Sequence, residues 1–396
     1  MSKLKIIFVL FIILFAVSGC ERIADKVILP PDTTPAGTQP LTVMTYNVYV
    51  GSSAAPLLSV ENLGQVPGEV ATMYNNVMAS DFPSRAVAIA KSINAHQPHI
   101  VGLQEISLIR RQSPGDLLLG GTVSAEEVVL DYLDILMDAL QAEGLSYQVA
   151  AQVENLDIEM PMVMGTDLLD VRLTDYDVIL SRSDVEISNP MTANYENALT
   201  IEMLGLVVKR GYAAVDATVS GVTYRVVNTH LEAFIEESRV AQTQELVDIL
   251  SGETMPIILL GDFNTPAPDG TAYQMLLSAG YVDVWSLDNW PYACCLDANN
   301  PGCNACAMEN RKANDIIGKL HAMRAGNESG NTCCQDDDIL NEVSDLTVRI
   351  DQIFVRNMDL SLPVLSFTVG DKPSDRLPSG LWPSDHAGVV AQFTFE

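Results

Sequence analysis

The segment Leu260-Gly261-Asp262-Phe263-Asn264 decides which fold this 396-residue chain is expected to adopt. It completes an apolar run, and we expect a buried strand over 256–261. Asp262 and Asn264 then stand where a protein core would not tolerate a polar side chain. Alone, Asp-Phe-Asn after a glycine is also typical of a turn with side-chain-to-backbone bonds. Because α/β sheets place their sites at strand ends, the segment equally predicts a functional site.

Five further segments end an apolar run in the same way. Each has an ordinary structural explanation by itself, such as a turn asparagine or a solvated glutamate. Together, their histidines, carboxylates and asparagines at predicted strand ends favour one common site. The segments are Tyr46-Asn47, Gln104-Glu105, Asn228-Thr229-His230-Leu231, Arg349-Ile350-Asp351 and Ser384-Asp385-His386.

Strand and helix patterns alternate along the chain. Strands are predicted at 42–48, 99–105, 147–153, 176–182, 212–219, 223–229, 256–261, 349–355, 364–368 and 388–395. A helix capped by Ser84 runs to Ile93, and a capping box of Ser124 and Glu127 begins an amphipathic helix to Leu140. Further helices are expected at 236–250 and 271–279, and residues 52–82 read as an insertion with short helical pieces. The pattern predicts mixed sheets in one α/β or α+β domain over 41–396.

This ordered set of strand ends resembles the endonuclease/exonuclease/phosphatase superfamily, which includes pancreatic-type deoxyribonucleases, abasic-site endonucleases, inositol polyphosphate 5-phosphatases and neutral sphingomyelinases. The resemblance is carried most specifically by 260–264, 228–231 and 384–386. It implies a four-layer sandwich of two mixed β-sheets flanked by helices. It also implies hydrolysis of a phosphate ester by direct attack of water, with no covalent intermediate.

The resemblance, with the chemistry of phosphoryl transfer, assigns roles to the first of these residues. Glu105 is expected to bind the metal, with Asn47 helping through its carbonyl oxygen and Asp385 as a further ligand. Such hard oxygen ligands suit Mg²⁺, with Mn²⁺ or Ca²⁺ as alternatives. Asp262 is the expected general base for the attacking water, and Asn264 is expected to hold that water or a phosphate oxygen.

The histidines are expected to contact the phosphate. His386 would donate to the phosphoryl oxygens, paired with Asp351, which favours its protonated form, and His230 would be a second donor. Arg210 could bind substrate phosphate or form an ordinary salt bridge, so both interpretations stay open. Asp177 is interpreted as a solvated residue at a sheet edge in preference to a site residue.

One position departs from the abasic-site endonucleases. They carry a carboxylate two residues after the first asparagine, and here that position is Tyr49. The departure weakens any transfer of their metal arrangement and of their role in DNA repair.

The N-terminus indicates export. Lys3 and Lys5 precede an apolar run over 6–17, and small residues then precede Cys20. This resembles a bacterial lipoprotein signal peptide over 1–19, with Cys20 becoming the lipid-modified N-terminus; a plain signal peptide or a membrane anchor is the alternative. Residues 20–40 would then be the lipidated cysteine and a proline-containing linker. We expect an exported protein, anchored by lipid to a bacterial membrane at the outer membrane or the cell surface.

Composition limits the substrate. Hydrophobic residues make up 48% of the chain, which excludes intrinsic disorder. The formal net charge is −29, so nucleic acid is the less favoured substrate, because phosphate backbones are bound mainly through Lys and Arg. A lipid headgroup or small phosphoester is therefore expected, as for sphingomyelinases or phospholipases C, with an extracellular or periplasmic Mg-dependent nuclease as the alternative. We expect a monomer.

A cysteine-rich insertion is predicted over 286–345. Six cysteines in an exported protein favour disulfide bonds over a zinc site, and bridges within the adjacent pairs are not expected. The insertion is expected either to shape substrate choice or to stabilise the surface. The cysteines are Cys294, Cys295, Cys303, Cys306, Cys333 and Cys334.

Overall fold

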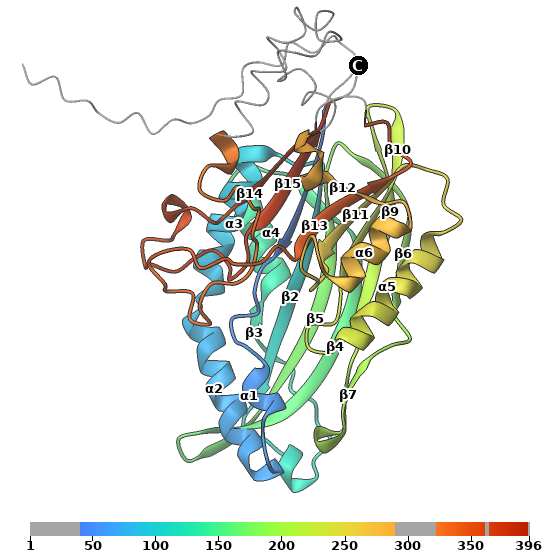
Figure 1. The fold of residues 1–396 in the computed structure, drawn as a ribbon. Helices are drawn as coiled ribbons and strands as arrows, with labels where there is room; N and C mark the ends of the chain where they lie inside the picture. Colours follow the sequence, from blue (N-terminus) through green and yellow to red (C-terminus); the bar gives the residue numbers. More distant parts are fainter. Residues whose placement is uncertain (1–39, 290–321, 361–363, 395–396) are drawn as a thin grey trace, which may run out of the picture. The chain divides into compact units, whose positions relative to one another are not determined.

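Two mixed β-sheets bring the polar strand ends together (Figure 1). The structure, a computed structural model, describes residues 40–289, 322–360 and 364–394. Within them, the first sheet has the order β14-β15-β1-β2-β5-β4, with β3 also paired to β2, and only β1 and β2 run parallel. Its strands are β14 (Val364–Val369), β15 (Gly388–Phe393), β1 (Leu41–Asn47), β2 (Ile100–Gln112), β5 (Asp167–Arg182), β4 (Tyr147–Met164) and β3 (Glu127–Asp131).

The second sheet has the order β12-β13-β11-β10-β9-β6. Its only parallel pair among the described strands is β10 with β11. A separate two-stranded ribbon joins β7 (Leu199–Ile201) to β8 (Leu206–Val208). The sheet strands are β12 (Val282–Asp283), β13 (Asp351–Arg356), β11 (Ile257–Asp262), β10 (Val222–His230), β9 (Gly211–Val219) and β6 (Glu186–Asn194).

The alternation of side chains along each strand produces the layers. Val43 and Leu260 belong to the core between the two sheets, whereas their neighbours Met44 and Leu259 face outward to helices. The helices α3 (Phe82–His96) and α4 (Tyr132–Ala142) cover the first sheet. The helices α5 (Glu236–Leu250) and α6 (Thr271–Ser278) cover the second, as Figure 1 shows. The expected four-layer sandwich is confirmed.

Residues 52–82 are more ordered than the sequence suggested. They contain α1 (Ala55–Leu58) and the longer α2 (Val66–Ala79), which packs on β4. The next helix begins earlier than expected: its N-cap is Asp81, whose carboxylate accepts the backbone N–H of Ser84. The prediction of Ser84 as the cap was wrong by one turn, because an aspartate three residues earlier provides a stronger acceptor.

The capping box of Ser124 and Glu127 was also wrong. Residues 127–131 form β3 against β2, and α4 starts only at Tyr132, capped by the Asp131 side chain. The β-branched residues of this segment pair with the sheet before the amphipathic pattern continues as a helix. The strands β6, β7 and β8 were not predicted either. β6 lies at a sheet edge and is exposed along most of its length, so it lacks the alternation that marks a half-buried strand.

Two predictions concern segments outside this description. The expected signal peptide, Cys20 and nearly all of the linker precede residue 40, and residues 290–321 of the cysteine-rich insertion are likewise outside the described residues. Among the helices that are described, none is long and apolar enough to cross a membrane.

Candidate active site

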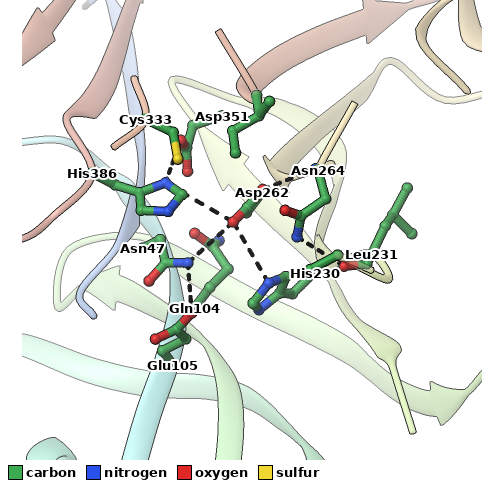
Figure 2. A network of polar contacts seen from close by, with 12 residues as sticks. Asn47, Gln104, Glu105, His230, Leu231, Asp262, Asn264, Cys333, Asp351 and His386 are labelled. Carbon is green, nitrogen blue, oxygen red and sulfur yellow. Dashed lines mark hydrogen bonds and ion pairs between the residues drawn. The ribbon is translucent and has the colours of Figure 1, made fainter. Parts of the chain in front are cut away.

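Three neighbouring strands of the second sheet bring His230, Asp262 and Asp351 together. The register pairs His230 of β10 with Asp262 of β11, and Asp262 with Asp351 of β13. Residues paired across a sheet point to the same face, so the three polar side chains become neighbours. His230 Nε2 lies 3.5 Å from Asp262 Oδ2, and all three residues are buried. Figure 2 shows the group from close by.

Asn47 connects this group to the first sheet. Its amide nitrogen donates to Glu105 Oε1 over 3.0 Å and to Asp262 Oδ2 over 3.1 Å (Figure 2). Its carbonyl oxygen instead accepts the backbone N–H of Tyr49 over 3.0 Å. Asn47 thus contacts the carboxylates through its NH₂ group, and in this orientation the oxygen predicted to assist the metal faces the backbone.

Glu105 and Asp385 provide oxygen donors in one cavity. Glu105 lies at a bulge of β2 with a φ of +61°, and its Oε2 accepts the Val50 N–H over 2.6 Å. Burial, opposed by His386 and assisted by the negative charge of Glu105, raises the pKa of Asp385 to about 7. Both residues are half-buried, and carboxylates that repel each other in one cavity favour a bound cation. Their hard oxygens fit Mg²⁺ better than a soft metal.

Asp262, Asp351 and His386 form a second acidic and histidine cluster, with potential ligand atoms within 4.8 Å of one another. Within it, His386 Nδ1 lies 2.7 Å from Asp351 Oδ2, so two of the three groups already bind each other. Burial alone would lower the pKa of His386, but Asp351, Asp385 and Asp262 together raise it well above its ordinary value. His386 is therefore held in the protonated form.

Asp262 has the properties of a base. Burial and the charge of Asp351, opposed by His386, raise the pKa of Asp262 to about 7. Its Oδ1 accepts the backbone N–H of Asn264 over 2.9 Å, and the Asn264 side chain donates to the Leu231 carbonyl over 3.0 Å. Asn264 has a φ of +49°, a left-handed conformation that asparagine tolerates better than most residues.

Arg210 determines which ring nitrogen of His230 carries the proton. Arg210 Nη1 lies 3.1 Å from His230 Nδ1. A guanidinium only donates, so Nδ1 is the acceptor and the ring proton is on Nε2, on the side of Asp262. Burial, together with the charges of Arg210 and His386, lowers the pKa of His230 well below its ordinary value. His230 is therefore neutral and presents an N–H to the site.

The interpretation of Asp177 as a solvated edge residue was wrong. Asp177 is 0% exposed, because β5 lies between β2 and β4 and is not an edge strand. Its Oδ2 accepts from Asn155 Nδ2 over 2.7 Å, and its Oδ1 lies 3.8 Å from His230 Nδ1. Burial and the charge of Asp175 raise the pKa of Asp177 well above its ordinary value.

Arg85 is an important residue that the sequence did not indicate. It lies on α3, is 0% exposed, and donates to the backbone carbonyls of Ser80, Val48, Tyr49 and Pro383. It thereby connects the loop after β1 to the loop that precedes Asp385. A single arginine in an amphipathic helix ordinarily indicates a solvated face, so no sequence signal distinguished it.

Gln104 and Asn228 also connect the two sheets. Gln104 Nε2 donates to Asn228 Oδ1 over 2.6 Å, and Asn228 Nδ2 donates to the carbonyls of Leu103 and Val178. Both residues were part of the predicted strand ends. Their side chains contact the protein framework and each other.

The cysteine pair at the site differs from the expectation. The structure joins the sulfur atoms of Cys333 and Cys334 within the pair, whereas bridges to other cysteines were expected. Cys334 Sγ lies 3.9 Å from His386 Nε2, so this end of the insertion adjoins the site. Cys294, Cys295, Cys303 and Cys306 lie outside the described residues, and their pairing stays a prediction.

The site combines a carboxylate with a raised pKa, a charged donor, a neutral donor and further carboxylate oxygens at the strand ends of two facing sheets. Such an arrangement is suited to phosphoester hydrolysis. The sequence pattern of the Endonuclease/Exonuclease/phosphatase family matches residues 44–386. The chain belongs to this family, whose members act on phosphoesters.

Several solved structures are similar to this chain at low sequence identity. A mannosyl-6-phosphatase of Bacteroides thetaiotaomicron VPI-5482 is 18% identical, with a TM-score of 0.49 over 90% of this chain and 100% of that chain. A truncated TDP2 of Caenorhabditis elegans is 16% identical, with a TM-score of 0.45 over 90% and 98%. A family protein from Leptotrichia buccalis C-1013-b is 14% identical, with a TM-score of 0.47 over 90% and 100%. No curated protein matches the chain. Similarity at this level carries no argument about the substrate.

Proposed function

We propose that the protein is a metal-dependent phosphoesterase that hydrolyses its substrate by direct attack of water. The observation that supports this most strongly is that Glu105, Asp385, His230 and His386 line one cavity. Asp262 lies directly behind the two histidines, with its Oδ2 3.5 Å from His230 Nε2 and 3.9 Å from His386 Nδ1. Phosphoester hydrolysis requires an activated water, donors to the phosphoryl oxygens and positive charge near them. The residues around the cavity meet each of these requirements.

Asp262 acts as the general base. A base is most effective when its pKa lies near the working pH, and the pKa of Asp262 is raised to about 7. The backbone N–H of Asn264 and the amide of Asn47 fix the carboxylate in one orientation. Asn264 positions the attacking water or a phosphate oxygen next to it.

The two histidines stabilise the developing negative charge in different ways. His386, protonated beside Asp351, donates a charge-assisted hydrogen bond to a phosphoryl oxygen. His230 is neutral and donates through Nε2, while Arg210 fixes its ring. Donors held in place before the reaction stabilise charge without reorganising during it.

Glu105 and Asp385 would hold the metal. Mg²⁺, or Mn²⁺ or Ca²⁺ in its place, supplies the positive charge that neutralises phosphoryl oxygens when bound. Asn47 holds the Glu105 carboxylate by its amide nitrogen, and the Val50 N–H holds the second oxygen. These contacts orient the ligand.

A small or membrane-borne phosphoester is the proposed substrate. The formal net charge of −29 disfavours a long polyanion. The signal-like segment ending at Cys20 supports export and lipid anchoring, which would hold a monomeric enzyme beside a membrane of the cell envelope. A lipid headgroup then becomes an accessible substrate.

The test is hydrolysis by the purified full-length protein with Mg²⁺, offered bis-p-nitrophenyl phosphate, sphingomyelin vesicles and duplex DNA. We expect turnover of the small diester or the lipid, loss of turnover with a chelator, and loss in Asp262→Asn. Cleavage of DNA without either other activity would establish the nuclease alternative. A folded protein inactive on all three with several divalent metals would refute the proposal.

A further inference from the structure

The cavity at the active site continues far beyond the catalytic residues. It has a volume of about 450 Å³, which lies in the range of pockets that bind small molecules. One end is polar and is lined by His230, Asn264, Asp385 and His386. The remainder extends over the first sheet toward α1, α2 and the β7–β8 ribbon, and most of its lining is apolar. None of the catalytic roles proposed above requires this extension.

The strand register explains why the floor changes from polar to apolar. On one face of the sheet, Ser107 of β2, Asp175 of β5 and Leu156 of β4 are paired across the strands. Two residues further along, the paired positions are all aliphatic. They are Ile109, Leu173 and Ile158.

At the next step of the same face, Arg111 of β2 is paired with Val171 and does not line the cavity, so the apolar lining continues on β5 and β4 alone. Val171 of β5 is paired with Met160 of β4, and both line the cavity. From Asp175 to Val171 the floor extends about 13 Å, at a strand rise of about 3.3 Å per residue. Beyond Asp175, the described side chains that β2, β4 and β5 contribute to the cavity are apolar.

The walls are apolar as well. On one side, α1 contributes Leu57, and α2 contributes Val70 and Met73. On the other, the β7–β8 ribbon contributes Leu199 and Leu206. Figure 1 shows α1 and α2 beside the strands at the end of the sheet where β7 also lies.

We propose that this apolar extension binds the hydrocarbon chain of a phosphoester whose phosphate lies at His386 and His230. The inference rests on the proposed function and names the substrate class for that site. The extension is continuous with the catalytic end of the cavity, so a single molecule can occupy both. Burying an alkyl or acyl chain against these side chains is favourable in proportion to the apolar area removed from water.

A polar substituent fits the extension less well. A sugar or a nucleotide base would bring hydroxyl groups or ring nitrogens to Ile109, Ile158 and Leu173, whose side chains offer no hydrogen bond. A polar group buried without a partner costs free energy, whereas a hydrocarbon chain costs none. The lining therefore selects against these substituents and in favour of a chain.

Chain length is the variable that tests the inference. The full-length protein is assayed with p-nitrophenyl phosphodiesters carrying a methyl, butyl or octyl group, each below the concentration at which it aggregates. We expect kcat/KM to rise about fourfold for each methylene that enters the extension. Active hydrolysis of the methyl ester with no gain from longer chains would overturn the inference and leave the proposed function standing.

Substitutions in the floor of the extension test whether the chain-length dependence of kcat/KM arises there. Leu173→Gln and Ile158→Gln change half-buried side chains of the floor, and we expect each to reduce the ratio of octyl to methyl kcat/KM toward one. The matched control is Val222→Gln, because Val222 is 45% exposed at the far end of β10 and does not line the cavity. An equal loss of the ratio in the control variant would contradict the assignment.

A binding measurement distinguishes failure of the extension to bind a hydrocarbon chain from failure of the proposed hydrolysis. Titration of dodecylphosphonate and methylphosphonate into the protein requires no turnover. Tighter binding of the dodecyl compound, with a negative heat-capacity change that Leu173→Gln diminishes, supports the extension even if hydrolysis fails. Equal affinities overturn it.

Assays with lipid vesicles distinguish membrane lipids from soluble phosphoesters as the source of the hydrocarbon chain. Hydrolysis of phosphatidylcholine or sphingomyelin in vesicles would identify membrane lipids, and hydrolysis of the monomeric octyl ester alone would identify a soluble long-chain phosphoester. Both results support the binding of a hydrocarbon chain.

Discussion

Replacing Asp351 by Asn tests how the site uses its most basic histidine. Asp351 and His386 are both buried, and Asp351 Oδ2 lies 2.7 Å from His386 Nδ1. Asparagine preserves the shape of the side chain but removes its negative charge. The substitution therefore changes the charge state of His386 with little change in packing.

The expected loss of kcat/KM follows from the contact between Asp351 and His386. A hydrogen bond to a charged group contributes about 1.5–3 kcal/mol, and its loss in the transition state lowers kcat/KM about tenfold to hundredfold. The pKa provides a second signature. His386 acts in its protonated form, which is present below its pKa in the folded protein and is lost as pH rises through it. Removing Asp351 lowers that pKa, so activity should decline at a lower pH than in the wild type.

The assay is the pH dependence of kcat/KM on a soluble diester, with Asp216→Asn as control. Asp216 is also buried and lies 2.8 Å from Arg225 Nε, about 17 Å along β10 from His230 at the usual strand rise. The control should lose stability and keep the activity profile. If Asp351→Asn retained wild-type kcat/KM with the same pH profile, the assigned role of the pair would be refuted.

Three other substitutions and one treatment extend the test. Asp262→Asn should lower kcat about 10²- to 10⁴-fold without altering the circular dichroism spectrum, as expected for loss of a general base. Asp177→Asn should be more stable than the wild type near pH 7 in urea unfolding, with the difference shrinking toward pH 4, because the folded protein raises the pKa of this buried acid and loses stability as pH rises. Arg85→Met should lower the free energy of unfolding by about 3–5 kcal/mol in the same measurement, because it leaves several buried carbonyls without donors. Dialysis against a chelator should abolish turnover, and Mg²⁺ should restore it; full activity after dialysis would contradict metal dependence.

The layered architecture was largely predictable from the sequence. The strand that ends at Asp262 and the strand that ends at Asn47 are apolar runs with polar termini, and such runs are a local signal. Residues at the ends of adjacent strands meet whenever the sheet forms. Predicting the group of His230, Asp262 and Asp351 therefore required little more than the correct strand register.

Features that depend on distant contacts were not predictable. Whether Asp177 is solvated depends on β4, which pairs along the second edge of β5. A strand was predicted at 147–153, but no local pattern shows which strand lies beside which. Arg85 is buried because its partners come from the loops at 48–49 and 383. The orientation of Asn47 depends on a backbone N–H two residues later and on carboxylates of both sheets.

The apolar extension was missed for the same reason. The sequence predicted only strands at 147–153 and 176–182, so the parts of β4 and β5 that form the floor of the extension were not predicted, nor what covers them. In the structure α2 packs against β4, and the cavity remains open between these elements and the β7–β8 ribbon. A substrate preference can thus be inferred only once the strands, helices and ribbon are placed together.

The stereochemical course at phosphorus tests the central claim most directly. The protein is given one stereoisomer of a phosphorothioate diester in water labelled with a heavy oxygen isotope, with Mg²⁺ present. The labelled oxygen makes the thiophosphate product chiral, so that its configuration at phosphorus can be determined. A single in-line displacement by water, activated by Asp262, predicts inversion. Retention would show two displacements through a covalent intermediate on the protein, and would contradict direct attack of water in this site.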